Sequence, residues 1–143
     1  MTNPIWRNTP TLAQLNAPSP TLNTHLGIEF IEIGPDFLRA RMQVDQRTHQ
    51  PMGLLHGGAS VALAETIGSV GAFLTIDMAT QAVVGLEINA NHVRGVREGF
   101  VIATAKPTHI GRTTQIWEIR ITDEADKLVC ISRFTVAVLD KTP

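Results

Sequence analysis

The feature that most constrains this sequence is a run of 19 residues, 58–76, that has a helical pattern and is nearly all apolar. A helix that is apolar on almost every side is either enclosed by its own protein or inserted in a membrane. At 1.5 Å per residue this one would be about 28 Å long, which is enough to span a bilayer. We favour the enclosed helix, because Glu65 would sit mid-bilayer at a cost of several kcal/mol. Gly58, Gly68 and Gly71 also weaken an isolated span.

The sequence around this run is dominated by patterns of period two. In residues 37–44 every second side chain is apolar, and Arg39 and Arg41 lie between them, which is typical of a half-buried strand. Six strands are expected: Ile28–Ile33, Phe37–Val44, Ala82–Val93, Phe100–Lys106, Thr113–Thr122 and Leu128–Leu139. The loops between the later strands are too short for parallel crossovers, so we predict a mostly antiparallel sheet. The result is an α+β domain whose sheet curls around the helix.

Length and local composition define the organisation of the chain. Its 143 residues suit a single domain, with a Pro-rich arm at residues 1–24 and the folded domain at residues 25–140. Within the arm, Thr9 suits a helix N-cap and Pro10 the first helical position, which predicts a short helix. Residues 1–20 contain no apolar run of the kind found in a secretory signal, so we expect a cytoplasmic location.

Charge and cysteine content exclude several classes of function. The formal net charge is −1, so no overall field attracts nucleic acid or an anionic membrane, and we expect neither as a partner. Cys130 is the single cysteine, which rules out an internal disulfide and a multi-cysteine zinc site. The five histidines show no helical metal-binding spacing, so no metal is expected.

Glu65 is the one ionisable group between His56 and Asp77. Burying an unpaired carboxylate is costly, so such a group usually finds a partner or shifts its pKa. One interpretation is a partly exposed side chain on the open side of the helix. The other is a general base or nucleophile in a cleft. Ser69 lies one turn further on, on the same face, where its hydroxyl could orient the carboxylate or a water.

The segment before the helix, Leu55–Gly58, suggests an anion-stabilising helix start. The first N–H groups of a helix lack internal partners and carry the positive end of its dipole. Gly57 and Gly58 would let a substrate carbonyl approach that backbone, as in an oxyanion hole, although a plain glycine turn is the simpler alternative. His56 could donate to a substrate, cap the helix or stay exposed. Gln50 is an ordinary loop residue unless a site places it.

Two basic stretches, residues 92–97 and 106–112, each lie at the end of an expected strand. They could hold phosphate groups at the mouth of a pocket, or they could be scattered solvated charges. Residues 58–62 approach a nucleophile elbow but lack its final glycine, and no P-loop or dinucleotide-binding glycine motif is present.

Three segments, at residues 50–60, 63–69 and 83–92, resemble the hotdog-fold acyl-CoA thioesterases. The similar group includes the Arthrobacter-type 4-hydroxybenzoyl-CoA thioesterases and, most similar, the bacterial 1,4-dihydroxy-2-naphthoyl-CoA hydrolases of menaquinone synthesis. The resemblance covers residues 25–139. It implies an antiparallel sheet of five to six strands wrapped around one long helix.

The resemblance also implies roles for individual residues. It places the catalytic carboxylate on Glu65, the N–H that polarises the thioester carbonyl on Gly57, and supporting polar groups on Gln50, His56 and Ser69. It places contacts to coenzyme A on His92, Arg94, His109 and Arg112. Phe73 is expected to help shape the acyl pocket. Coenzyme A is part of the substrate, so the resemblance implies no separate cofactor and no metal. It also implies dimers, which are usually paired into tetramers.

Spacing along the helix adds a constraint of its own. Gly57 and Glu65 are eight residues apart, or about 12 Å along a helix axis, which a Glu side chain cannot bridge. If both act on one thioester, Glu65 must come from a second subunit, and two antiparallel helices related by a twofold axis would create two identical shared sites.

The sequence therefore predicts an acyl-CoA thioesterase with an aromatic substrate, best matched by 1,4-dihydroxy-2-naphthoyl-CoA. Glu65 would act as nucleophile or as general base. Alternatives are a broad-specificity acyl-CoA or acyl-carrier-protein thioesterase, a hydroxyacyl-thioester dehydratase on the same fold, and a protein that binds acyl thioesters without cleaving them.

Overall fold

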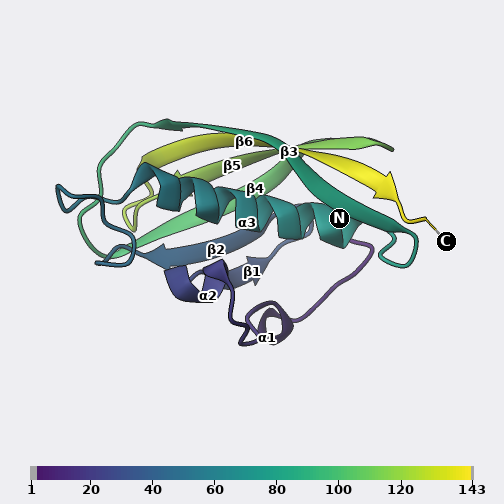
Figure 1. Ribbon diagram of the computed structural model, residues 1–143, viewed down its shortest axis with the longest axis horizontal. Coiled ribbons are helices and arrows are strands. Elements are labelled where there is room, and N and C mark those ends of the chain that lie inside the picture. The colour runs from purple at the N-terminus through teal and green to yellow at the C-terminus, as the bar shows by residue number, and fades with distance from the viewer. Residues whose placement is uncertain (1–2, 143) are drawn as a thin grey trace.

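One six-stranded antiparallel sheet carries a long helix, α3, across one face in the computed structural model, which describes residues 3–142 (Figure 1). The strands are β1 (Glu29–Ile33), β2 (Leu38–Gln43), β3 (Gln81–His92), β4 (Phe100–Ile110), β5 (Thr114–Thr122) and β6 (Leu128–Asp140). The helices are α1 (Leu12–Leu15), α2 (Leu22–Leu26) and α3 (Gly57–Thr75). The strand order is β1-β2-β4-β5-β6-β3. The predicted α+β hotdog architecture is confirmed.

The alternating pattern of the strands matches their burial. In β2, the side chains of Leu38, Ala40 and Met42 are fully buried on the helix side of the sheet. In β5, Trp117 and the residues two and four positions from it, Gln115, Ile119 and Ile121, are buried, whereas the charged residues between them are exposed. One apolar face per strand is what a sheet covered on a single side requires.

Two glycines bring α3 close to the aromatic residues of the sheet. A Cβ built on Gly68 would lie 2.8 Å from the Phe134 ring, and one built on Gly71 would lie 2.8 Å from the Trp117 ring. By length and composition α3 could cross a membrane. Its glycine face instead packs against two buried rings, as a core helix does. The helix begins and ends one residue earlier than the sequence pattern predicts.

The prediction that β4 ends at Lys106 is wrong. The strand continues through Pro107 to Ile110, and its pairing with β5 shifts register between Pro107 and His109. Proline cannot donate to a strand ladder, and a bulge is one of the few places where a sheet tolerates it. The sequence pattern alone reads this proline as a strand end.

The N-terminal arm is folded against the domain. Trp6 stacks on Trp117 with 6.2 Å between ring centroids, and its indole N–H donates to the Gly34 carbonyl. The Asn8 side chain donates to the Ile76 carbonyl just beyond the end of α3, 3.0 Å away. Trp6 and Asn8 therefore cover the far end of the core helix.

The short helices of the arm differ from the prediction. The N-cap of α1 is Thr11 rather than Thr9, because Thr11 forms a reciprocal capping box with Gln14. A second helix, α2, was not predicted at all. It has five residues and one buried side chain, Leu26, so it leaves no periodic signal, and it crosses the expected boundary between the arm and the domain.

Candidate active site

Two hollows lie beside the first half of α3, and each contains predicted site residues. The first, here called the Gly57 cavity, has a volume of about 390 Å³ and includes Gln50, Gly57, Ser60, His92 and Arg94 in its lining. The second, here called the Glu65 groove, has a volume of about 500 Å³. It is lined by Leu22, Asn23, Gly58, Val61, Ala62, Glu65, Thr66, Ser69 and Val70.

The start of α3 presents an unused backbone donor. The Gly58 N–H donates to Nδ1 of His56, the N-cap residue, over 2.8 Å. Within residues 3–142, no group accepts a hydrogen bond from the Gly57 N–H. This N–H lies at the positive end of the helix dipole and lines the Gly57 cavity, so it is available to polarise a carbonyl.

His56 caps the helix, which is one of the three roles that the sequence left open. Because Nδ1 accepts from Gly58, a neutral His56 ring carries its proton on Nε2. The ring is exposed and lines a third hollow, of about 290 Å³, beside the Glu65 groove. Of these hollows, His56 lines this one and not the Gly57 cavity of its own protomer.

The side chains around Gly57 can accommodate a polar ligand. A Cβ built on Gly57 would lie 2.8 Å from His92 Nε2, so only glycine lets this ring approach the helix start without displacement. Gln50 accepts from the Met52 N–H through Oε1, which leaves its amide NH₂ for a ligand. Arg94 is exposed at the same cavity. The structure thus brings Gln50, Gly57, His92 and Arg94 together at one cavity, and the roles that the resemblance gives them stay predictions.

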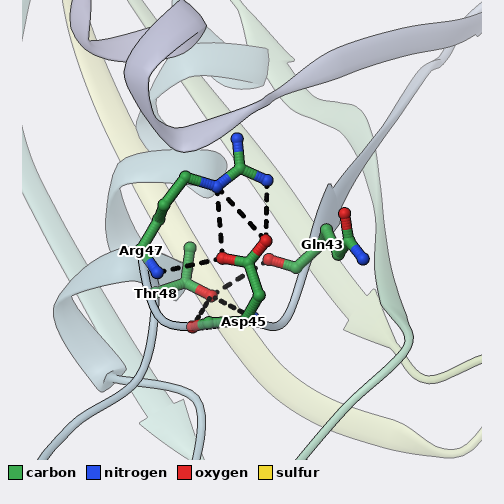
Figure 2. Close-up of polar contacts among 4 residues, drawn as sticks. All are labelled: Gln43, Asp45, Arg47 and Thr48. Atoms are coloured by element: carbon green, nitrogen blue, oxygen red, sulfur yellow. Dashed lines mark hydrogen bonds and ion pairs between the residues drawn. The ribbon is translucent and has the colours of Figure 1, made fainter.

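The loop between β2 and α3 is fixed by a buried hydroxyl and an ion pair (Figure 2). The Thr48 side chain, 2% exposed, donates to the Gln43 carbonyl at 3.0 Å, and the Thr48 carbonyl accepts from the His56 N–H at 2.8 Å. Next to it, the Arg47 guanidinium contacts the Asp45 carboxylate at 2.8 Å. Hydrogen bonds from Arg47 hold the pKa of Asp45 below its usual value. Thr48 therefore links the end of β2 to the helix cap.

A second loop, residues 93–98, is fastened to the first. The Leu55 N–H donates to the Val96 carbonyl at 2.7 Å, and His49 Nε2 lies 2.8 Å from the Arg97 carbonyl. These contacts hold both sides of the Gly57 cavity in place. None of His49, Thr48 or Arg47 was predicted as a site residue, because their roles depend on contacts distant in sequence.

Glu65 is exposed in the protomer and lines the groove close to strand β3. Its Oε1 lies 3.0 Å from where a Cβ on Gly85 would be. Ser69 lines the same groove, on the face predicted from its spacing. The opposite wall comes from α2, where Asn23 Oδ1 accepts a 3.0 Å hydrogen bond from Thr66. The α2 wall was missed by the sequence reasoning.

The protomer does not bring all predicted residues together. Glu65 and Gly57 line different hollows, and Phe73 lines neither of the two, although its side chain is 42% exposed on α3. His109 and Arg112 lie near the β4–β5 turn. That end of the sheet carries the last turn of α3, to which Gln115 is hydrogen-bonded through Thr75.

His92 and Arg94 lie at the other end, beside the first turn of α3. One protomer therefore cannot offer all four basic residues to a single coenzyme A. Within residues 3–142, no three His, Cys, Asp or Glu side chains lie close enough together to hold a metal ion. The predicted absence of a metal is left a prediction.

A family model described as the thioesterase superfamily matches residues 52–130, which include all of α3, from Gly57 onward, and the edge strand β3. The chain belongs to this superfamily. The thioesterase is 54% identical over 136 residues to the 1,4-dihydroxy-2-naphthoyl-CoA hydrolase of Escherichia coli (strain K12), covering 94% of this chain and 99% of the relative.

A second relative carries a different name. The thioesterase is 53% identical over 136 residues to the proofreading thioesterase EntH of Cronobacter turicensis, covering 94% of this chain and 98% of the relative. Its fold matches the crystal structure of a mutant of thioesterase PA1618 from Pseudomonas aeruginosa, with a TM-score of 0.94 and 49% identity over 96% of this chain and 99% of that chain. The chain is therefore a thioester hydrolase of the acyl-CoA thioesterase type.

Proposed function

We propose that this thioesterase hydrolyses an aromatic acyl-CoA in the cytoplasm, with 1,4-dihydroxy-2-naphthoyl-CoA of menaquinone synthesis as the best candidate. The observation that carries the mechanism is the division of the chemistry between two hollows. The free Gly57 N–H lines one of them and the Glu65 carboxylate lines the other. The name of the Escherichia coli relative supports the choice of acyl group.

The chemistry follows from these two groups. The Gly57 N–H donates to the carbonyl oxygen of the thioester and stabilises the negative charge that develops there. The Glu65 carboxylate either attacks the carbonyl carbon, forming a mixed anhydride that water then hydrolyses, or takes a proton from the water that attacks. The C–S bond breaks and coenzyme A leaves as a thiolate. Ser69, one helical turn from Glu65, is placed to orient the carboxylate or the water.

Both groups can reach one thioester only across a dimer. The strand β3 forms an edge of the sheet, with 12 residues and with Val84 and Leu86 44% and 59% exposed. A long edge strand with apolar side chains is a template for pairing with another chain. A second copy of this thioesterase is the partner that the shared site requires.

The contacts of β3 indicate how such a dimer would complete the site. Glu65 lies against Gly85, and Gly57 lies against His92, seven residues further along the same strand. If two β3 strands pair antiparallel about a twofold axis midway between these positions, Gly85 of one faces the partner's His92. Glu65 then lies beside the partner's Gly57. The same operation forms a second, identical site.

The other edge of the sheet is blocked, which supports β3 as the interface. The strand β1 has five residues, and the Asn16 side chain of the arm bonds both the N–H and the carbonyl of Phe30 at 2.8 Å. An edge covered in this way cannot extend the sheet. In the proposed dimer, His92 and Arg94 bind coenzyme A phosphates from one subunit, and His109 and Arg112 contribute from another. A homotetramer is the proposed final assembly.

The test is release of a free thiol, detected with a thiol reagent. The substrates are 1,4-dihydroxy-2-naphthoyl-CoA, benzoyl-CoA and hexanoyl-CoA, which release coenzyme A, and an acyl-carrier-protein thioester, which releases the thiol of the carrier protein. We expect the highest kcat/KM with the naphthoyl substrate. Cys130 is buried, and burial raises the pKa of its thiol, so the folded protein gives no background signal. Tight binding of acyl-CoA without thiol release would contradict hydrolysis and favour an acyl-thioester sensor.

A second candidate is a thioesterase of broad specificity that acts on acyl-CoA or on carrier-bound acyl groups. It is favoured by the nearly equal identity, 54% and 53%, to a naphthoyl-CoA hydrolase and to a proofreading thioesterase. Comparable kcat/KM for aromatic and aliphatic substrates, or a preference for the carrier-protein thioester, would select this candidate. Hydration of an enoyl-CoA without thiol release would instead indicate a dehydratase.

A further inference from the structure

The outer wall of the Glu65 groove is supplied by α2, a helix of the N-terminal arm. Leu22, its first residue, is 59% exposed, yet its side chain lines the groove together with Glu65. We infer that Leu22 contacts the acyl group and determines which acyl groups fit, and that the hydrogen bond between Asn23 and Thr66 holds it in position. The inference rests on the proposed function, because it assigns the groove to the acyl part of a thioester.

The surface of α3 is shaped to receive α2. Gly58, Ala62 and Thr66 are spaced four residues apart, so they form one stripe on the helix, and all three line the Glu65 groove. Gly58 has no side chain and Ala62 has a small one, which leaves room for α2 beside α3. The third donates a 3.0 Å hydrogen bond to Asn23, 43 residues away in the sequence. Because Thr66 directly follows Glu65, this bond ties the wall to the turn that carries the acid.

The two ends of α2 are held by different contacts. At its end, Gly27 adopts a left-handed conformation with φ 70°, and the Arg47 guanidinium lies 2.8 Å from where a Cβ on Gly27 would be. At its start, the N-cap Thr21 makes no side-chain capping bond. Within residues 3–142, the bond that the Thr66 hydroxyl donates to Asn23 is the one side-chain hydrogen bond that joins α2 to α3. Its loss should therefore loosen the first turn, where Leu22 lies, more than the last.

Leu22 also separates two hollows. It lines the Glu65 groove of about 500 Å³ and also the neighbouring hollow of about 290 Å³ that contains His56. Truncating its side chain would join these spaces and lengthen the room available to an acyl group whose carbonyl lies near Glu65. Enlarging it would shorten that room. Leu22 is therefore placed to select acyl groups by size and takes no part in the chemical step.

The test compares kcat and KM for acetyl-CoA, benzoyl-CoA and 2-naphthoyl-CoA in Leu22→Ala and Leu22→Trp. A methylene-scale change in an apolar pocket shifts selectivity by about tenfold or more. We expect the ratio of kcat/KM for 2-naphthoyl-CoA to that for benzoyl-CoA to rise about tenfold in Leu22→Ala and to fall about tenfold in Leu22→Trp. Acetyl-CoA has the shortest acyl group, so its kcat/KM should change less than that of either aromatic substrate.

Leu12→Ala is the matched control, because Leu12 is another exposed leucine of the arm and lines none of the three hollows. It should leave all three substrates unchanged. Asn23→Ala and Thr66→Val should each alter the selectivity ratio, and the double variant should show no larger change than either single variant. Thr66→Ser keeps the hydroxyl, so its selectivity ratio should equal that of the wild type.

Two outcomes would overturn the inference while leaving the proposed function intact. One is an equal change of kcat/KM for all three substrates in both Leu22 variants. The other is a selectivity ratio that stays at the wild-type value in both. If the wild-type protein releases thiol from none of the acyl-CoAs, both the inference and the proposed function fail.

Discussion

The Gly57 cavity and the Glu65 groove lie on the same helix, but they are held in different ways. Around Gly57, backbone hydrogen bonds join the loops before α3 and after β3, and a buried Thr48 connects them to β2. Around Glu65, the wall formed by α2 is tied to α3 through one side-chain bond, between Asn23 and Thr66. The helix start is thus rigidly framed, whereas the middle of the helix is open on one side.

The difference fits the chemistry that each hollow would perform. A donor that stabilises a developing oxyanion is effective when its position is fixed before the reaction, since no energy is then spent on reorganisation. An acid in an open groove needs a further surface to exclude water and to face the carbonyl. We expect that surface to be the Gly57 cavity of a second subunit.

The largest loss of activity should come from a change in the Glu65 groove, the open side of the site. Replacing Glu65 with Gln keeps the shape of the side chain but removes the carboxylate, so kcat should fall about 10²–10⁴-fold. The measurement is steady-state thiol release, with dimer content checked by light scattering. Glu98→Gln is the control, because Glu98 is an exposed carboxylate that lines neither hollow. Turnover of Glu65→Gln near that of the wild type would remove Glu65 from the mechanism.

Substitution at the Gly57 cavity, the rigidly framed side of the site, should reduce activity almost as much. In Gly57→Val the new side chain would meet His92 Nε2, which is 2.8 Å from the Cβ position, and would cover the free N–H. We expect kcat to fall about 10²–10³-fold, as on removal of one oxyanion donor. The melting temperature should change little, because the side chain of His92 can move away. A variant that unfolds would be replaced by Gly57→Ala.

Mixing these two inactive variants tests whether the hollows work across subunits. A hybrid dimer of Glu65→Gln and Gly57→Val contains one site with both native groups and one site with neither. Random exchange makes half of the dimers hybrid, so activity should return to about a quarter of the wild-type value. Hybrids shown to form, for example by native mass spectrometry, but lacking activity would place both groups in one subunit or in different reactions.

The exposed edge strand gives a further test of the same contrast. Leu86→Lys puts a charge on the edge of β3, where Leu86 is 59% exposed, and should shift the protein toward monomers with a parallel loss of turnover. Ile110→Lys is the control, because Ile110 is also an exposed apolar residue, 44% accessible, but ends the interior strand β4. An active monomer in the Leu86→Lys variant would contradict the shared site.

Sequence patterns predicted the framed side better than the open side. The apolar run, the alternating strands and the short loops were sufficient for α3 and the sheet. The resemblance also pointed to Gln50, His92 and Arg94 as site residues, and the structure finds all three beside Gly57 at one cavity. The helix and strands follow from local periodicity, and the site residues were found through the resemblance of short segments.

What the sequence did not predict depends on long-range contacts. Helix α2 has five residues and is fastened to α3 by a side chain 43 positions away, so its wall over Glu65 has no local signature. The two basic stretches look alike in sequence, but the sheet places His92 and His109 at opposite ends of α3. Pro107 resembles a strand end until a bulge is seen to accommodate it.

The smallest effect concerns the ion pair that supports the framed side. Hydrogen bonds from Arg47 lower the pKa of Asp45, so the carboxylate is more acidic in the folded protein than in the unfolded chain. Its contribution to stability is therefore present above the unfolded pKa and is lost as the pH falls through the folded one, below about pH 4. Asp45→Asn should lower the melting temperature slightly at neutral pH, and the difference from the wild type should shrink as the pH falls below about 4.

The check is thermal unfolding of both proteins between neutral pH and about pH 3, with Asp126→Asn, which replaces an exposed carboxylate in the turn before β6, as the control. A difference that does not shrink over this range would mean that the Asp45 side chain supports the loop by its hydrogen-bonding shape and not by its charge.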